Sequence, residues 1–86
     1  MPDTTPRAVR GLETNEVTDG MTVYNPATDR IHYLNATAAV VFSLCDGQRT
    51  TSEIAEFVAE GYGLEEPPVD EVERCLRDLD AEGLLG

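Results

Sequence analysis

The chain has 86 residues and a formal net charge of −11, from seventeen acidic residues against six arginines and no lysine. A chain of this length forms one small domain that buries only roughly 60% of its unfolded surface, which leaves little room for a deep enzyme cleft. Such an acidic surface repels nucleic-acid phosphates and anionic lipid. No apolar run reaches the roughly 18 residues that a membrane helix needs. Nucleic acid and membrane are therefore not expected partners.

The first eight residues contain two prolines and no periodic pattern, which predicts a flexible N-terminal arm over residues 1–8 and a folded domain over 9–86. The first twelve residues contain no apolar stretch of signal-peptide length. We therefore expect a cytoplasmic location.

Three extended segments come first in the domain, at residues 12–17, 21–24 and 30–34. Asp19-Gly20 offers the positive φ that tight hairpin turns require. Asn25-Pro26 begins a longer reversal. The pattern predicts a three-stranded antiparallel meander.

The first helix is predicted to begin at Asn35, whose side chain can accept hydrogen bonds from amides two or three positions on. It is predicted to end at Gly47. Residues at helical spacing define its buried face: Ala38, Val41, Phe42 and Cys45.

The second helix opens with Thr50-Thr51-Ser52-Glu53, the pattern of a capping box. Glycines 61 and 63 end it. Its predicted apolar stripe consists of Ile54, Phe57, Val58 and Tyr62.

The third helix follows Pro67-Pro68 and is predicted to end at Gly83, with Leu84-Leu85 folding back on its last turn. Its predicted inner stripe consists of Val69, Val72, Leu76 and Leu79, with Cys75 at the margin. The order β-β-β-α-α-α indicates an α+β fold, in which a three-stranded antiparallel sheet precedes a three-helix bundle in a winged helix-turn-helix-like arrangement.

The residues of a catalytic or metal site are missing from the pattern. His32 is the only histidine, and no acid or nucleophile can be placed beside it. Cys45 and Cys75 lie thirty positions apart and form no Cys-x-x-Cys unit, so free core thiols are expected. We expect no enzyme activity, no metal and no cofactor. His32 has two open interpretations, a polar residue on the outer face of an edge strand or a residue that touches a ligand.

Nearly the whole chain, from about residue 9 to 85, resembles the PqqD-like family, the precursor-peptide recognition elements of ribosomally made, modified peptides. The residues that carry the resemblance are Asp19-Gly20, Tyr33-Leu34-Asn35-Ala36-Thr37-Ala38-Ala39, Leu44-Cys45-Asp46-Gly47, the Thr-Thr-Ser-Glu-Ile run at 50–54, and Glu82-Gly83-Leu84-Leu85. Ala36 stands where the family has proline, a departure at a first-turn site that other residues also suit.

The resemblance implies that the chain binds the leader region of a precursor peptide. It also implies delivery of that peptide to a modifying enzyme such as a radical SAM enzyme or a cyclodehydratase, or to a leader protease. In such domains the leader adds as an antiparallel strand beside the third strand and lies against the third helix. Carried onto this chain, the implied site consists of Arg30, Ile31, His32, Tyr33 and Leu34 on one wall and Glu71, Val72, Cys75, Asp78 and Leu79 on the other.

The sequence supports this mechanism at one point. A meander leaves two unpaired edges, and the third strand has neither a proline nor a lysine to protect its edge. Such an edge can recruit another strand, either a peptide or a second copy of the chain as a homodimer. Glu71 and Asp78 within a strongly negative field favour a leader that carries Lys or Arg.

Two alternatives remain beside peptide recognition. One is a generic protein-interaction module that binds a folded partner. The other is a winged-helix DNA-binding domain, which the charge opposes because the third helix holds Arg74 and Arg77 against six acids.

Overall fold

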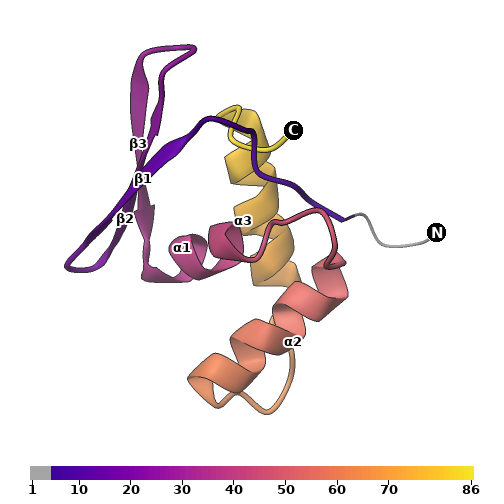
Figure 1. Ribbon diagram of the computed structural model, residues 1–86. Helices are drawn as coiled ribbons and strands as arrows, with labels where there is room; N and C mark the ends of the chain where they lie inside the picture. The colour runs from indigo at the N-terminus through magenta and orange to yellow at the C-terminus, as the bar shows by residue number, and fades with distance from the viewer. Residues whose placement is uncertain (1–4) are drawn as a thin grey trace.

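The computed structural model describes residues 5–86, which form a small sheet followed by three helices (Figure 1). The elements in chain order are β1 Glu13–Val17, β2 Gly20–Asn25, β3 Arg30–Asn35, α1 Ala36–Ser43, α2 Thr51–Tyr62 and α3 Val69–Ala81. The predicted β-β-β-α-α-α order is confirmed.

The sheet is an antiparallel meander with strand order β1-β2-β3. Gly20 lies opposite Asn35, and a Cβ at position 20 would overlap the carbonyl of Leu34, so the strands approach too closely there for any side chain. In the second turn the Asn25 side chain accepts from the amide of Ala27, and Asp29 takes a left-handed φ of 57°. The sheet packs its Val23 and Leu34 face on the helices.

Helix α1 begins where the sequence predicts, since the Asn35 side chain accepts from the amide of Ala38 at 2.9 Å. The predicted end at Gly47 is wrong, because the helix ends at Ser43 with Leu44 as its C-cap. Beyond it, Gly47 has a φ of 79° and donates to the carbonyl of Pro6. The glycine therefore turns a connecting segment and does not cap the helix.

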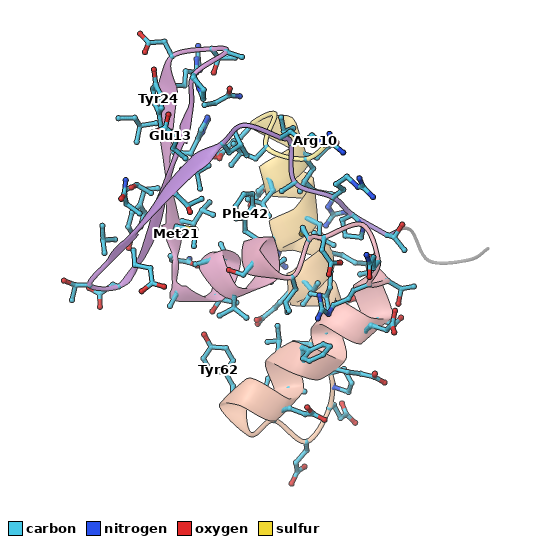
Figure 2. All side chains as sticks on the ribbon, in the orientation of Figure 1. Arg10, Glu13, Met21, Tyr24, Phe42 and Tyr62 are labelled. Atoms are coloured by element: carbon cyan, nitrogen blue, oxygen red, sulfur yellow. The ribbon has the colours of Figure 1, made fainter. Side chains whose placement is uncertain are left out.

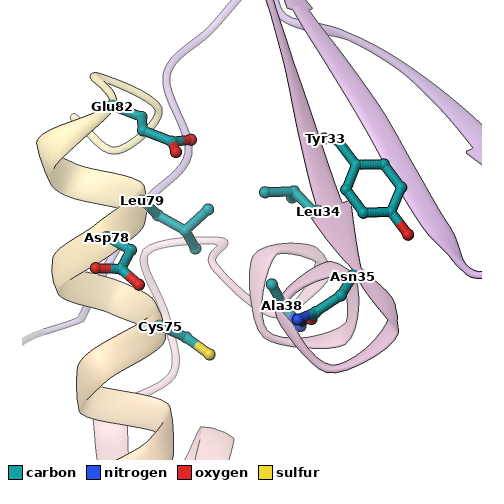
Figure 3. Close-up of a pocket in the computed structure, with 8 residues that line it drawn as sticks. All are labelled: Tyr33, Leu34, Asn35, Ala38, Cys75, Asp78, Leu79 and Glu82. Carbon is teal, nitrogen blue, oxygen red and sulfur yellow. Dashed lines mark hydrogen bonds between the residues drawn. The ribbon is translucent and has the colours of Figure 1, made fainter.

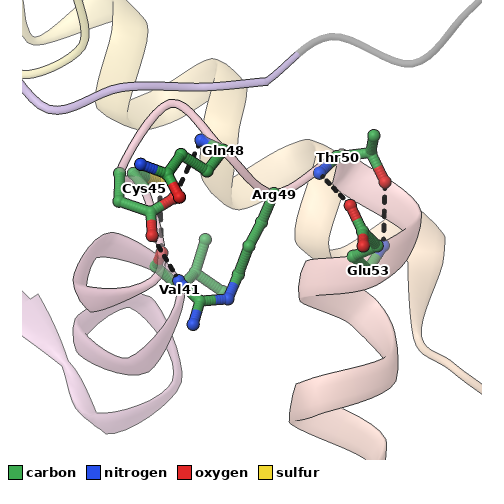
Figure 4. Close-up of polar contacts among 7 residues, drawn as sticks. Val41, Cys45, Gln48, Arg49, Thr50 and Glu53 are labelled. Atoms are coloured by element: carbon green, nitrogen blue, oxygen red, sulfur yellow. Dashed lines mark hydrogen bonds and ion pairs between the residues drawn. The ribbon is translucent and has the colours of Figure 1, made fainter.

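Helix α2 has the predicted capping box: the Thr50 hydroxyl accepts from the amide of Glu53, and the Glu53 carboxylate accepts from the amide of Thr50 (Figure 4). Its buried stripe differs from the prediction. Phe57 and Tyr62 are 47% and 50% exposed, and Ala55 and Ala59 are buried together with the correctly predicted Ile54 and Val58. The ring of Phe57 instead lies under the guanidinium of Arg49, 4.9 Å away.

Helix α3 buries Val72 and Leu79, while Cys75 and Leu76 are half-buried and Val69 is exposed. Gly83, at a φ of 76°, turns the chain at its end, and the amide of Leu84 donates to the carbonyl of Leu79. Leu84 is consequently fully buried in the core, as the predicted fold-back requires.

The structure differs from the predicted N-terminal arm at residues 6–8; residues 1–4 lie outside the described part of the chain. Ala8 donates to the carbonyl of Cys45, Gly86 donates to the carbonyl of Arg7, and an isolated bridge joins Ala8 to Leu85. These main-chain bonds tie the segment to the connection after α1 and to the C-terminal residues. Within residues 5–86, no helix is long and apolar enough to span a membrane.

Candidate functional site: a groove between β3 and α3

Strand β3 is an edge strand, because β2 pairs with one side of it and no described residue pairs with the other. Its outward main-chain groups are therefore available to a further strand. The side chains alternate as a pleated strand requires, with Leu34 directed into the core and Tyr33 and Ile31 exposed on the opposite face.

A hollow of about 180 Å³ separates the end of β3 from α3. It is lined by Tyr33, Leu34, Asn35, Ala38, Cys75, Asp78, Leu79 and Glu82. In Figure 3, Leu34 and Leu79 point toward each other across this hollow, and the ring of Tyr33 points away from α3. Because the Tyr33 side chain points away, the main chain of Tyr33 borders the hollow and is open to pairing with a peptide backbone.

The residues with which α3 lines the hollow recur at helical spacing. Cys75, Asp78 and Glu82 follow one another at three and four residues, so they lie on one stripe of the helix. The floor is apolar, and the two carboxylates stand on one wall. We call the space between β3 and this stripe the β3–α3 groove.

His32 lies at the Glu82 end of the groove. Its Nδ1 atom lies 3.2 Å from Oε2 of Glu82, and its Nε2 atom is buried without a hydrogen-bond partner among the described residues. The interpretation of His32 as an outer-face residue is wrong, because His32 stands opposite the fully buried Val23 in β2 and shares its face of the sheet. The imidazole therefore points to the helix side of the sheet and contacts Glu82, the C-cap residue of α3.

The structure brings five of the ten predicted site residues to the hollow: Tyr33, Leu34, Cys75, Asp78 and Leu79. His32 lies at its end. Arg30 and Ile31 continue the strand beyond it, and Glu71 borders a neighbouring hollow one turn earlier on α3. Val72 is a core residue that lines neither of these two hollows.

Three lining residues were not predicted, namely Asn35, Ala38 and Glu82. The spacing of Glu82, four residues after Asp78, places it on the same face of a helix, and this signal was readable in the sequence. Ala38 was assigned wholly to the helix core, although its small side chain leaves space beside the strand.

Both cysteines are free, as expected. Burial, with Asp78 and Glu71 nearby, raises the pKa of the Cys75 thiol. Burial, with Asp46 nearby, raises the pKa of Cys45 to about 11. Both groups are therefore neutral thiols at pH 7, and Cys75 contributes an uncharged, polarisable surface to the groove. No group of three or more His, Cys, Asp or Glu residues in the described chain could hold a metal ion.

The chain is similar to known proteins in both sequence and fold. Residues 20–85 match the family model described as coenzyme PQQ synthesis protein D (PqqD). No curated protein is similar enough to the chain to count as a match.

Two solved structures are similar to this chain. TbiB1 in complex with the TbiA(beta) leader peptide is 20% identical with a TM-score of 0.76, and the match covers 92% of this chain and 93% of TbiB1. The second is the solution NMR structure of the PqqD truncation of Methylobacterium extorquens PqqCD, described as a functional and stand-alone recognition element for ribosomally synthesised and post-translationally modified peptides. It is 27% identical with a TM-score of 0.68, and the match covers 94% of this chain and 87% of that one.

Proposed function

This chain belongs to the PqqD family, and we propose on that basis that it binds the leader region of a ribosomally made precursor peptide and presents it to a modifying enzyme or a leader protease. The observation that carries the proposal is the β3–α3 groove, an unpaired strand edge with an apolar floor and a second wall opposite. The solved leader complex of TbiB1 supports this role in a protein of the same fold.

The leader binds by strand addition. An extended peptide antiparallel to β3 pairs its main chain with the free edge, and this pairing gives affinity that depends little on sequence. Alternate side chains of the peptide point into the groove, where the partly buried Ala38 and the outer surfaces of the core residues Leu34 and Leu79 form an apolar floor. Selectivity between peptides comes from those side chains.

Charge sets a second preference. Asp78 and Glu82 stand on the groove wall of a chain whose formal net charge is −11. A leader with Lys or Arg near these carboxylates gains attraction and a faster encounter, whereas an acidic leader is repelled. Raising the salt concentration weakens this attraction, because exposed charges are screened over about 8 Å at physiological ionic strength.

The chain itself supplies no chemistry in this proposal. The free leader is a flexible segment, so ordering it opposes binding and holds the affinity down. Docking of the domain on its enzyme then raises the effective concentration of the peptide core at the active site. In this way a binding module accelerates a modification that another protein catalyses.

The proposal is tested by fluorescence anisotropy with overlapping labelled peptides that cover the short reading frames encoded beside this chain. We expect one peptide to bind with a micromolar or lower Kd, and its scrambled version to bind at least tenfold more weakly. Equal binding of the scrambled peptide, or no binding by any peptide, would contradict the proposal.

A further inference from the structure

A second hollow, of about 300 Å³, lies among the three helices. It is lined by Thr37, Val58, Tyr62, Leu64, Pro68 and Glu71. These residues come from the first turn of α1, the second half of α2, the connection between α2 and α3, and the first turn of α3. We call this space the α1–α2–α3 hollow.

Large apolar side chains are open to water around this hollow. Tyr62 is 50% exposed and Leu64 is 45% exposed, and Figure 2 shows Tyr62 projecting from the end of α2. Their positions are fixed, because Gly63 takes a φ of 66° and the amide of Leu64 donates to the carbonyl of Ala59 at 2.8 Å. Tyr62 and Leu64 therefore offer apolar surface at the rim of the hollow, against which an apolar side chain of a partner can pack.

The α1–α2–α3 hollow and the β3–α3 groove are lined by neighbouring positions on the same two helices, α1 and α3. On α3, Glu71 borders the hollow and Cys75, one turn later, borders the groove. On α1, the neighbours Thr37 and Ala38 border the hollow and the groove respectively. The acidic stripe of α3 runs through both, from Glu71 to Asp78 and Glu82.

We infer that the α1–α2–α3 hollow takes an apolar side chain from the N-terminal flank of the same leader peptide that pairs with β3. This inference rests on the proposed function. The leader that supplies this apolar side chain also carries a Lys or Arg. Glu71 extends the acidic wall formed by Asp78 and Glu82 beyond the groove, and this wall attracts a basic residue of the peptide. The direction follows from the pairing: β3 runs toward α1, so an antiparallel peptide has its N-terminal end at α1.

Helix geometry sets the spacing of the apolar residue. Asp78 lies seven positions after Glu71, which corresponds to about 10 Å along a helix at 1.5 Å per residue. An extended peptide covers that length in about three residues at 3.3 Å each. The apolar side chain therefore lies about three to four positions before the leader residue that faces Leu34.

The test is a binding cycle that combines two domain variants with two peptides. The variants are Leu64→Ser and Phe57→Ser, both at exposed apolar positions, of which only Leu64 borders the hollow. The peptides are the bound labelled peptide from the neighbouring reading frames and a version in which its N-terminal flanking apolar residue is replaced by serine. Thermal unfolding of each variant checks that the fold is retained.

We expect Leu64→Ser to lower the affinity for the unmodified peptide about five- to tenfold and to leave the affinity for the serine peptide unchanged. Phe57→Ser is expected to change the affinity for neither peptide. Equal losses for both peptides, or no loss with Leu64→Ser, would overturn the inference while leaving strand addition intact. Binding of no peptide at all would overturn both the inference and the proposed function. A loss of self-association in Leu64→Ser, with peptide affinity unchanged, would assign the hollow to a second copy of the chain and likewise overturn it.

Discussion

The two edges of the sheet offer the same kind of main-chain groups in different surroundings. All five residues of β1 are exposed, and no described strand or helix wall stands beside its free edge. The free edge of β3 faces a hollow with an apolar floor, and α3 with its two carboxylates forms the opposite wall. A bare strand edge recruits partners without discrimination, whereas an edge with a second wall can also select side chains. The second wall therefore distinguishes a binding edge from a merely open one.

The largest expected effect comes from removing main-chain hydrogen bonds on the peptide side. N-methylation of successive leader amides is expected to weaken binding about tenfold at every second position and little at the positions between, because alternate amides face β3. Isothermal titration of the methylated series measures this. A loss without alternation would show that the peptide does not pair as a strand.

Filling the groove separates the two edges directly. Cys75→Trp places a large ring in the 180 Å³ hollow and is expected to weaken peptide binding by up to about tenfold. The matched variant Glu16→Trp puts the same ring at an exposed position on β1 and is expected to leave binding unchanged. Equal losses of peptide affinity in the two folded variants would show that the peptide does not bind specifically beside β3.

A smaller effect is expected from charge on the helix wall. Asp78→Asn is expected to weaken a Lys- or Arg-containing leader about threefold, because its carboxylate borders the groove. Asp80→Asn removes the same charge from another face of α3 and tests the contribution of net charge alone. Peptide titrations at low and high salt measure the affinity of both variants. Identical losses of affinity in Asp78→Asn and Asp80→Asn would show that net charge, and not the position of Asp78 in the groove, causes the effect.

The smallest perturbation uses the two thiols as reporters. At pH 8, iodoacetamide is expected to alkylate Cys75 slowly, since its raised pKa keeps most of the group protonated, and a bound leader is expected to slow it further. Cys45, with a pKa of about 11, is expected to remain unmodified with or without peptide. Raising the pH should speed alkylation at Cys75 as the thiolate forms. Mass spectrometry of the alkylated chain measures both sites, and peptide-independent labelling of Cys75 would argue against occupation of the groove.

Much of the fold was readable because its signals are local. Asn35 and the Thr50–Glu53 capping box each depend on residues within four positions, and each was predicted correctly. A turn between the first two strands was also predicted correctly, but its basis was wrong, because Gly20 is the first residue of β2 and has no positive φ. The end of α1 was predicted wrongly. Gly47 was predicted to end the helix, but its amide donates a hydrogen bond to the carbonyl of Pro6, forty-one residues away in sequence. Long-range partners of this kind leave no periodic pattern.

The groove was predictable by element but not by side chain. Strand alternation could have placed His32 with Leu34 on one face, yet its contact with Glu82 depends on how α3 crosses the sheet. The exposure of Phe57 and Tyr62 has the same origin. Their helical spacing marks an apolar face, but the angle at which α2 packs decides that Ala55 and Ala59 are buried in their place.

Amide hydrogen exchange at the two sheet edges, followed by NMR with and without the bound peptide, tests strand addition most directly. The account predicts that outward-facing amides of β3 exchange at least tenfold more slowly in the complex, while those of β1 keep their rates. Unchanged exchange at β3 under saturating peptide, or equal protection at both edges, would contradict it.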